Sequence, residues 1–451
     1  MWASVIEAMG TPTTEILSPK VLARPEHRLS RGSLSEEALK VLYRLHRSGY
    51  AAYLVGGSVR DLLLDKRPKD FDVATNARPK EIRRLFRNSR IIGRRFRLVH
   101  VFFRGDIVEV ATFRASPEPP ESPDDWEEAV AEEAEENATT DRPQPATDDV
   151  VYGTPAEDAR RRDFTVNALF YNIADFSVID HVGGIEDLDR GVIRTIGDPD
   201  QRFIEDPVRM MRALEYGVRL GFEIDPRTKS AIYAQKELIA EASAPRLTYE
   251  LLESLRSGRA AGIHEAWRRA GVFTRAFPDL PVDTDESMRV LKMVDKEIES
   301  GREVSDASLI GSYFLGRFLA IAEEETSDAG RVDNPQVLGR LRDSLEPAST
   351  SMHLSNQTLH LLHQGLFALT KMRRPPERGR QVLKLARQDY FQVAWDLYGF
   401  AVSLGYISPE AYQGWMRALR KVGAKDRDDD TPTKAPEPPR RRPRRRPRRR
   451  R

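Results

Sequence analysis

The stretch RPKDFDVATNA at residues 67–77 places two aspartates, Asp70 and Asp72, one residue apart beside an apolar run. Its alternation of polar and apolar residues predicts the end of a strand, and side chains at positions i and i+2 of a strand point to the same face. Two carboxylates held side by side either share a proton or bind a cation. Because Mg²⁺ prefers carboxylate oxygens together with phosphates, the stretch predicts a magnesium site at the edge of a sheet.

A glycine turn precedes the two aspartates. The segment AAYLVGG at residues 51–57 predicts a short buried strand that ends in Gly56 and Gly57, and SVRDLLLDK predicts the helix that follows. Glycine has no Cβ, so the backbone can approach a phosphate closely, and the N-terminus of a helix favours an anion. The short distance to Asp70 in the sequence favours a phosphate site over an ordinary strand-to-helix turn.

A third carboxylate is expected from the strands that follow. RRFRLVHVFF and DIVEVATFR alternate like two paired strands, with RGD as the turn between them. Glu109 lies between two valines and faces away from them, so it is the expected third acid, and Asp106 in the turn is the alternative. Three such carboxylates can hold two metal ions about 4 Å apart, which activate a hydroxyl and stabilise a leaving pyrophosphate. This scheme needs no histidine, so His100 is expected to pack in its strand.

The composition excludes several classes of protein. The chain has 451 residues and no cysteine, which excludes disulfides, zinc-thiolate sites and thiol nucleophiles. It has no apolar run of about 18 residues and no basic leader followed by an apolar core, so neither a membrane span nor a secretory signal is predicted. We therefore expect a cytoplasmic protein of about two to four domains.

Charge is distributed unevenly along the chain. Residues 440–451 hold ten arginines, and without them the formal net charge of +2 becomes −8. Such a block predicts a disordered arm that contacts a phosphate backbone, with a solubility tail or an anionic membrane contact as alternatives. Residues 118–149 hold thirteen acidic side chains and one arginine. We expect a flexible acidic insertion at 115–150, and a nucleic-acid mimic is the less favoured interpretation.

Six stretches that follow one another in the chain carry a resemblance to a known family: GGSVRD, KDFDVAT, EVATFR, RRRDFTVNAL, DHVGGIEDL and EDPVRMMRAL. Over residues 27–265 the chain resembles the class II nucleotidyltransferases, which include the tRNA CCA-adding enzymes and the bacterial poly(A) polymerases. The resemblance implies attack of an RNA 3′-hydroxyl on the α-phosphate of a nucleotide, without a nucleic-acid template. It also implies that protein side chains choose the incoming base.

The resemblance implies an α+β fold. We expect a nucleotidyltransferase-type head with a small mixed sheet flanked by helices, then an all-helical neck and body, then a disordered basic tail. The expected boundaries are 1–27 for a flexible lead-in, 28–180 for the head with its insertion at 115–150, 181–265 for a neck that binds the base and RNA, 266–425 for a body that binds RNA, and 426–451 for the tail.

The family motifs imply roles for particular residues. By this resemblance, Asp70, Asp72 and Glu109 would bind two Mg²⁺ ions and carry out catalysis, and Gly56, Gly57 and Arg60 would bind the triphosphate. The residues Arg162, Asp163 and Asn167 would contact the phosphate and ribose of the nucleotide. The base edge would be recognised by Asp206 and Arg209. Asp206 and Arg209 are expected at positions i and i+3 of one helix, where an ion pair between them is the structural alternative and would also orient the arginine. Glu215 and Tyr216 stand where such proteins often carry Arg-Phe, so no role is transferred to position 215.

Several stretches favour the poly(A) polymerase branch of the family. LFRNSRIIGRRFRLVHVFF, APRLTYELLESLRSG and the arginine-rich C-terminus are similar to that branch. In GRRFRL, Arg94, Arg95 and Arg97 surround Phe96, and this cluster is predicted to hold the last nucleotides of an RNA by stacking and charge. An exposed basic strand is the structural alternative.

We therefore predict a polynucleotide adenylyltransferase that uses ATP to extend RNA 3′ ends. The expected RNAs are mRNA, small RNA and decay fragments, and the expected partners include the RNA-decay machinery. Nothing in the sequence requires more than a monomer. A CCA-adding enzyme that uses CTP and ATP on tRNA is the nearest alternative. A non-catalytic RNA-binding protein is a remote one, because all three carboxylates are present.

Overall fold

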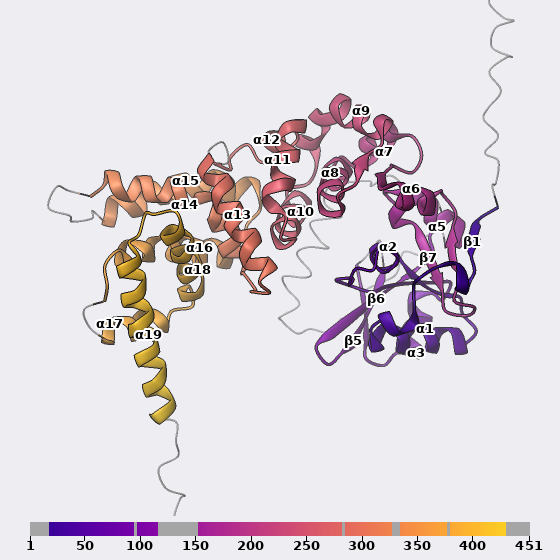
Figure 1. Cartoon of the computed structure of the whole chain (residues 1–451), viewed down its shortest axis with the longest axis horizontal. Coiled ribbons are helices and arrows are strands. Elements are labelled where there is room, and N and C mark those ends of the chain that lie inside the picture. The colour runs from indigo at the N-terminus through magenta and orange to yellow at the C-terminus, as the bar shows by residue number, and fades with distance from the viewer. Residues whose placement is uncertain are drawn as a thin grey trace, which may run out of the picture. The chain divides into compact units, whose positions relative to one another are not determined.

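The computed structural model describes residues 18–93, 97–115, 152–281, 285–326, 334–376 and 379–429. The chain divides into two compact units. The first comprises Met1–Val304 and Glu346–Leu354, and the second comprises Ser305–Leu345 and Ser355–Arg451. Figure 1 shows the strands and short helices early in the chain and longer helices later. Within the described ranges, no helix is long and apolar enough to cross a membrane.

A mixed sheet forms the centre of the head, as the family resemblance implied. Its eight described strands lie in the order β1-β8-β7-β2-β3-β6-β5-β4. Their bounds are β1 Lys20–Leu22, β2 Ala52–Val55, β3 Asp72–Thr75, β4 Ser89–Ile92, β5 Leu98–Phe103, β6 Asp106–Thr112, β7 Leu169–Asn172 and β8 Val178–Asp180. Strands β3 and β6 run parallel, with Val73 opposite Val110. The neighbouring pairs β2–β3 and β5–β6 are antiparallel.

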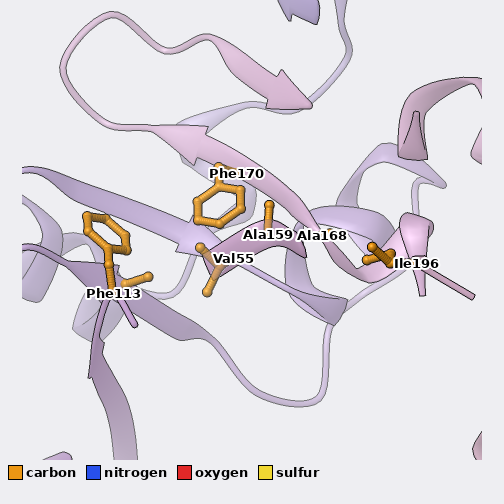
Figure 2. Close-up of a cluster of buried hydrophobic side chains, with 7 residues drawn as sticks. Val55, Phe113, Ala159, Ala168, Phe170 and Ile196 are labelled. Carbon is orange, nitrogen blue, oxygen red and sulfur yellow. The ribbon is translucent and has the colours of Figure 1, made fainter. Parts of the chain in front are cut away.

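Buried apolar side chains hold the strands that carry the predicted site. Val55 of β2, Ala74 of β3 and Phe170 of β7 belong to one cluster with Phe113 and Ile196 (Figure 2). Burial of each of these large side chains contributes about 2 kcal/mol, so the cluster fixes the strands that end in the glycine turn and begin at Asp72. Helix α1 (Glu36–Arg47) packs against β2, β3 and β6, and the Ser35 side chain caps it by accepting a hydrogen bond from the Ala38 amide.

Residues 20–27 correct the expected flexible lead-in. Strand β1 pairs antiparallel with β8, and Lys20 lies opposite Asp180. His27 is buried, with Nε2 2.8 Å from the carbonyl oxygen of Phe176. A three-residue edge strand has little local signal, because its stability comes from pairing with a strand that lies far away in the sequence. Residues 1–17 lie outside the described part of the chain.

The neck is helical, with one short exception. Helix α5 (Pro155–Arg161) still belongs to the head, and the helices that follow are α6 Gly184–Arg190, α7 Pro199–Glu205, α8 Val208–Leu220, α9 Pro226–Gln235, α10 Ala244–Arg256, α11 Ala260–Ala270, α12 Phe273–Ala276 and α13 Asp285–Glu299. The exception corrects the all-helical expectation: β9 (Val192–Ile193) and β10 (Glu223–Ile224) form a parallel pair. Trp267 is fully buried, and its Nε1 donates to the carbonyl oxygen of Met211 at 2.8 Å, which ties α11 to α8.

The predicted boundary between neck and body at 265 is wrong. It falls inside α11, and the first compact unit continues to Val304. Residues 346–354 then return to the first unit, where the carbonyl oxygen of Met352 accepts a hydrogen bond from Thr248 Oγ1 at 2.9 Å. A contact over about 100 residues leaves no trace in local composition, so the sequence did not indicate it.

The second unit is helical, as predicted for the body. Its helices are α14 Asp306–Glu324, most of α15 Asn334–Ser351, α16 Asn356–Met372, α17 Gly379–Ala386, α18 Phe391–Ser403 and α19 Pro409–Asp429. Two glycines allow α14, α16 and α18 to pack closely. A Cβ on Gly311 would lie 3.0 Å from Leu362 and Leu397, and a Cβ on Gly365 would lie 2.6 Å from Val393.

Candidate active site

Three carboxylates meet where β3 begins beside β6. Asp72 and Glu109 each precede the residue that pairs between these parallel strands, so they are neighbours across the sheet. Burial raises the pKa of Asp72 to about 7, with Glu109 and Asp70 acting in the same direction. Burial also raises the pKa of Asp70, and Glu109 again contributes. The three carboxylates therefore repel one another when they are ionised, and a bound cation would reduce this repulsion.

The sequence predicted that Asp70 and Asp72 lie in one strand and point to the same face. The structure corrects this prediction, because the two aspartates differ in their backbone setting. Asp72 is the first residue of β3, whereas Asp70 lies in the segment before the strand and is exposed. Within the described residues, no three histidine, aspartate or glutamate side chains converge into a ready-made metal cage. The carboxylates of Asp72 and Glu109, which are neighbours across the sheet, supply the oxygen donors that Mg²⁺ prefers together with phosphates and water.

His100 lies directly opposite Glu109 in the β5–β6 pair. Its Nε2 is 3.5 Å from Glu109 Oε2, and its ring contacts Phe102 edge to face. The prediction that His100 packs in its strand stands, but the sequence reading missed its contact with the carboxylate. The alternation of the two strands around the RGD turn, which sets the register, was the available signal.

The glycine turn faces the carboxylates. Gly56 precedes α2 (Gly57–Leu63) with φ of +73°, a conformation that favours glycine. A Cβ on Gly56 would lie 3.4 Å from Arg162 Nη1 and 3.8 Å from Asp72 Oδ2. Arg162 is held from its other side by Asp158, which accepts from Nη2 at 3.0 Å. A backbone turn, the Arg162 guanidinium and the Asp72 carboxylate therefore meet at one point, where a phosphate could be bound by the turn and the guanidinium.

The Arg60 side chain is not exposed at the point where Gly56, Arg162 and Asp72 meet. Its side chain is 2% exposed, Nη2 lies 2.7 Å from Asp61, and Nη1 donates to Asn167 Oδ1. The structure therefore brings Arg60 beneath the turn rather than into the predicted triphosphate contact. Asn167, in turn, donates from Nδ2 to Asp163 Oδ1 at 3.1 Å. Arg60 links α2 to the segment that was predicted to contact the ribose.

Arg212 of α8 completes this network and was missed in the sequence. Its Nε and Nη2 donate to Asp163 Oδ2 at 3.0 and 2.9 Å. Burial by itself would raise the pKa of Asp163. The charge of Arg212, together with hydrogen bonds from Arg212, Asn167 and the Phe164 amide, outweighs this effect and lowers the pKa. Arg212 lies one helical turn after the predicted Arg209, which was the available signal.

Tyr216 closes the network. Its hydroxyl accepts from Arg212 Nη2 at 3.0 Å, and its ring lies beneath the guanidinium groups of Arg60, Arg212 and Arg219 at 5.1, 5.4 and 5.0 Å. Glu215, also buried, pairs with Arg219 at 3.1 Å, and burial raises its pKa to about 7. Glu215 and Tyr216, to which no role was transferred, are therefore buried and belong to the same network as Arg212 and Asp163.

The predicted base-reading pair is brought together, but differently from the expectation. Asp206 ends α7 in extended backbone, and Arg209 lies in the first turn of α8, so they do not share a helix. Arg209 Nε is 3.5 Å from Asp206 Oδ2, and Arg246 of α10 approaches the same oxygen at 2.6 Å. The sequence could not indicate Arg246, because its partner is 40 residues away.

The other predicted contacts are described only in part. Arg97 precedes β5 and is half-buried. Arg94 and Arg95 lie outside the described residues, as do 116–151 of the acidic insertion and the tail from 430 onward. Their roles remain predictions.

Comparisons with known proteins agree with this geometry. A family model described as Poly A polymerase head domain matches residues 52–194, and one described as Probable RNA and SrmB- binding site of polymerase A matches 221–283. Poly(A) polymerase I of Salmonella typhi is 39% identical over 386 residues, which cover 84% of this chain and 80% of that protein. A CCA-adding enzyme of Lactobacillus gasseri is 38% identical over 232 residues, 51% of this chain and 52% of that enzyme.

A solved structure supports the fold independently. A tRNA-processing enzyme aligns with 88% of this chain and 94% of its own, with a TM-score of 0.53 and 22% identity. The predicted fold class is confirmed. Since a poly(A) polymerase I is matched over four fifths of its length, the chain belongs to the bacterial poly(A) polymerase family and is a polynucleotide adenylyltransferase that binds ATP and RNA.

Proposed function

We propose that this enzyme extends the 3′ ends of varied RNAs with AMP from ATP, with two Mg²⁺ ions held by Asp70, Asp72 and Glu109. The observation that carries the proposal is the meeting of Asp72, Gly56 and Arg162 at one point. When bound, Mg²⁺ lowers the pKa of the attacking hydroxyl and neutralises charge on the leaving pyrophosphate. The carboxylates stay ionised around the cation, and Arg162 directs Nη1 toward the phosphate position.

The network behind the site orients the nucleotide. Arg212 donates to Asp163 from both Nε and Nη2, and Asn167 donates to the other oxygen of Asp163. Asp163 and Asn167 therefore keep one fixed arrangement toward the ribose. The Asp163 carboxylate accepts hydrogen bonds and the Asn167 amide can both accept and donate them, so the pair can distinguish a 2′-hydroxyl from its absence. Because positioning supplies most of the catalysis in phosphoryl transfer, we expect this network to affect turnover more than protein stability.

Asp206 and Arg209 select the base of the incoming nucleotide. Arg246 holds the carboxylate of Asp206, so the pair presents acceptors and donors in a fixed order. The adenine edge needs one acceptor for its amino group and one donor for its ring nitrogen. A pocket of side chains needs no template and can repeat the same choice at every step.

The experiment is primer extension with purified protein and Mg²⁺, one nucleotide at a time, on a generic RNA and on a tRNA that lacks its CCA end. We expect long products with ATP alone on both. Growth that needs CTP and then ATP, and stops after three additions on tRNA, would show the CCA-adding reaction instead and overturn the proposal.

The wider setting is also part of the proposal. We expect a monomer that acts in the cytoplasm on mRNA, small RNA and decay fragments, in contact with RNA-decay machinery. The arginine-rich segment 440–451 supports a broad choice of RNA, because contacts to phosphates carry no sequence information.

A further inference from the structure

A cavity of about 600 Å³ lies in the neck, and none of Asp70, Asp72 and Glu109 lines it. Its walls are the end of α8, the turn between α10 and α11, and one side of α13, which neighbour one another in the structure (Figure 1). The residues that line it are Val218, Arg219, Leu220, Gly221, Gly258, Arg259, Gly262, Lys292, Asp295, Lys296 and Glu299.

The charge of this cavity is positive once its internal pairs are formed. Asp295 accepts hydrogen bonds from the amides of Ala260 and Ala261 at 2.5 and 3.0 Å and so caps α11. Glu299 pairs with Arg259 at 3.3 Å. The two acids that line the cavity are thus engaged.

Two lysines supply the remaining charge. Lys292 and Lys296 are exposed, one helical turn apart on α13, and have no ion-pair partner within the described part of the chain. Both line the cavity. With Glu299 paired to Arg259 and Arg219 paired to Glu215, the opening carries these two cations against the single carboxylate of Asp295, so its lining remains positive.

The wall of the cavity leaves room for the backbone of a bound strand. Gly221 ends α8 with φ of +75°, and a Cβ there would meet no atom within 4 Å. The wall at this point is main chain rather than side chain. A strand with a charged backbone can therefore approach closely beside the two lysines.

Helix α8 joins the cavity to the nucleotide site. Arg209 and Arg212, in its first turns, contact Asp206 and Asp163, whereas Leu220 at its end lines the cavity. Eleven residues of helix from Arg209 to Leu220 span about 16 Å. A stacked strand rises about 3.4 Å per nucleotide, so this span corresponds to about five nucleotides.

We propose that the cavity binds the RNA backbone about five nucleotides upstream of the growing 3′ end, with Lys292 and Lys296 on its phosphates. The inference rests on the proposed function and deepens it, because it assigns a place to the primer strand. The family model for RNA binding covers residues 221–283 and thus part of the wall, but the two lysines lie outside that range.

The test uses the full chain with Lys292→Ala and Lys296→Ala together. The matched control is Arg83→Ala with Arg84→Ala, two exposed cations of α3 (Pro79–Leu85) that neither line the cavity nor fall in the range of the RNA-binding family model. Binding of a fluorescent 12-nucleotide RNA and a 3-nucleotide RNA is followed against salt concentration. We expect the lysine variant to bind the 12-mer about tenfold more weakly, with a salt slope smaller by about 1.4. The 3-mer affinity and the KM for ATP should not change, and the control should match the parent.

Three results would overturn the proposal. These are an unchanged 12-mer affinity, an equal loss with the 3-mer, or failure of Lys292→Arg with Lys296→Arg to restore binding. Displacement of the 12-mer by pyrophosphate from the parent but not from the lysine variant would assign the cavity to free phosphate compounds instead. A parent enzyme that needs CTP would refute poly(A) addition, while a tenfold loss for the 12-mer would still support the upstream site.

Discussion

Asp72 and Glu109 are neighbours across the parallel pair of β3 and β6, each one residue ahead of the facing valines Val73 and Val110. The arrangement comes from sheet topology rather than from sequence distance, since the two acids are far apart in the chain. Parallel pairing brings equivalent strand positions together, so a motif of two aspartates gains a third acid from an adjacent strand.

Asp72→Asn should lower nucleotide addition by at least about 10³-fold, because the neutral amide cannot hold the cation that the cluster requires. RNA affinity should change little, since Asp72 lies at the nucleotide end of the site. Single-turnover extension and RNA-binding titrations measure both. Asp65→Asn is the control, as Asp65 forms an exposed pair with Arg28. Substantial activity in the Asp72 variant would remove this residue from the metal site.

Arg246→Ala should weaken the preference for ATP over CTP by about tenfold, because the carboxylate of Asp206 loses the guanidinium that orients it. The ratio of kcat/KM for the two nucleotides is the measurement. Arg256→Ala changes the same helix without touching Asp206 and should keep the preference. An equal loss of activity with both nucleotides would mean that Arg246 supports the fold alone.

Tyr216→Phe removes one hydroxyl and leaves the ring beneath its three arginines. The Arg212–Asp163 contact should loosen by about 1 kcal/mol, a several-fold fall in kcat/KM for ATP. The enzyme's preference for ATP over dATP should fall with it, because Asp163 lies in the ribose-facing network. Tyr233→Phe, at an exposed position on α9, serves for comparison. An unaltered ATP-to-dATP ratio would disconnect Tyr216 from ribose selection.

Glu215→Gln should change the pH dependence of stability. Burial raises the pKa of Glu215 to about 7 in the folded protein, against 4.5 for the ordinary side chain. The unfolded chain ionises first, so the parent loses stability as pH rises from about 4.5 through 7, by about 3 kcal/mol in total. The glutamine variant lacks this loss. Its Tm relative to the parent should therefore rise by several degrees between pH 5 and pH 8, and a constant difference would contradict the assignment.

Removal of residues 440–451 should weaken RNA binding and reduce its salt slope by several units, because up to ten phosphate contacts are lost. Affinity measured at several salt concentrations tests this. A chain with lysine at all ten arginine positions keeps the charge and should keep the slope. If the truncated chain retains the parent slope, the segment has another role.

Local rules predicted the parts of the molecule that depend on neighbouring residues. Gly56 occupies a positive-φ turn between β2 and α2, at the place where the sequence predicted a glycine turn. The alternation around Glu109 correctly placed it among the carboxylates. These features follow from backbone preferences within a few residues.

The rest depends on partners that are distant in the sequence. Arg60 was expected at the triphosphate, but Asn167, 107 residues later, holds it beneath the turn. Arg246 and the strand β1 went unpredicted for the same reason, because their partners lie in α7 and β8. Motifs predicted the candidate site residues, whereas the hydrogen-bond partners of those residues, such as Asn167 for Arg60, required the three-dimensional structure.

The return of residues 346–354 to the first unit has a consequence for how this chain can be divided. Met352 is buried, and its carbonyl oxygen accepts a hydrogen bond from Thr248 of α10, the helix whose Arg246 pairs with Asp206. A protein cut after Val304 would lose these residues together with the second unit. The catalytic half is therefore not one continuous piece of the gene, and a shortened enzyme would need residues 346–354 rejoined to it through a linker.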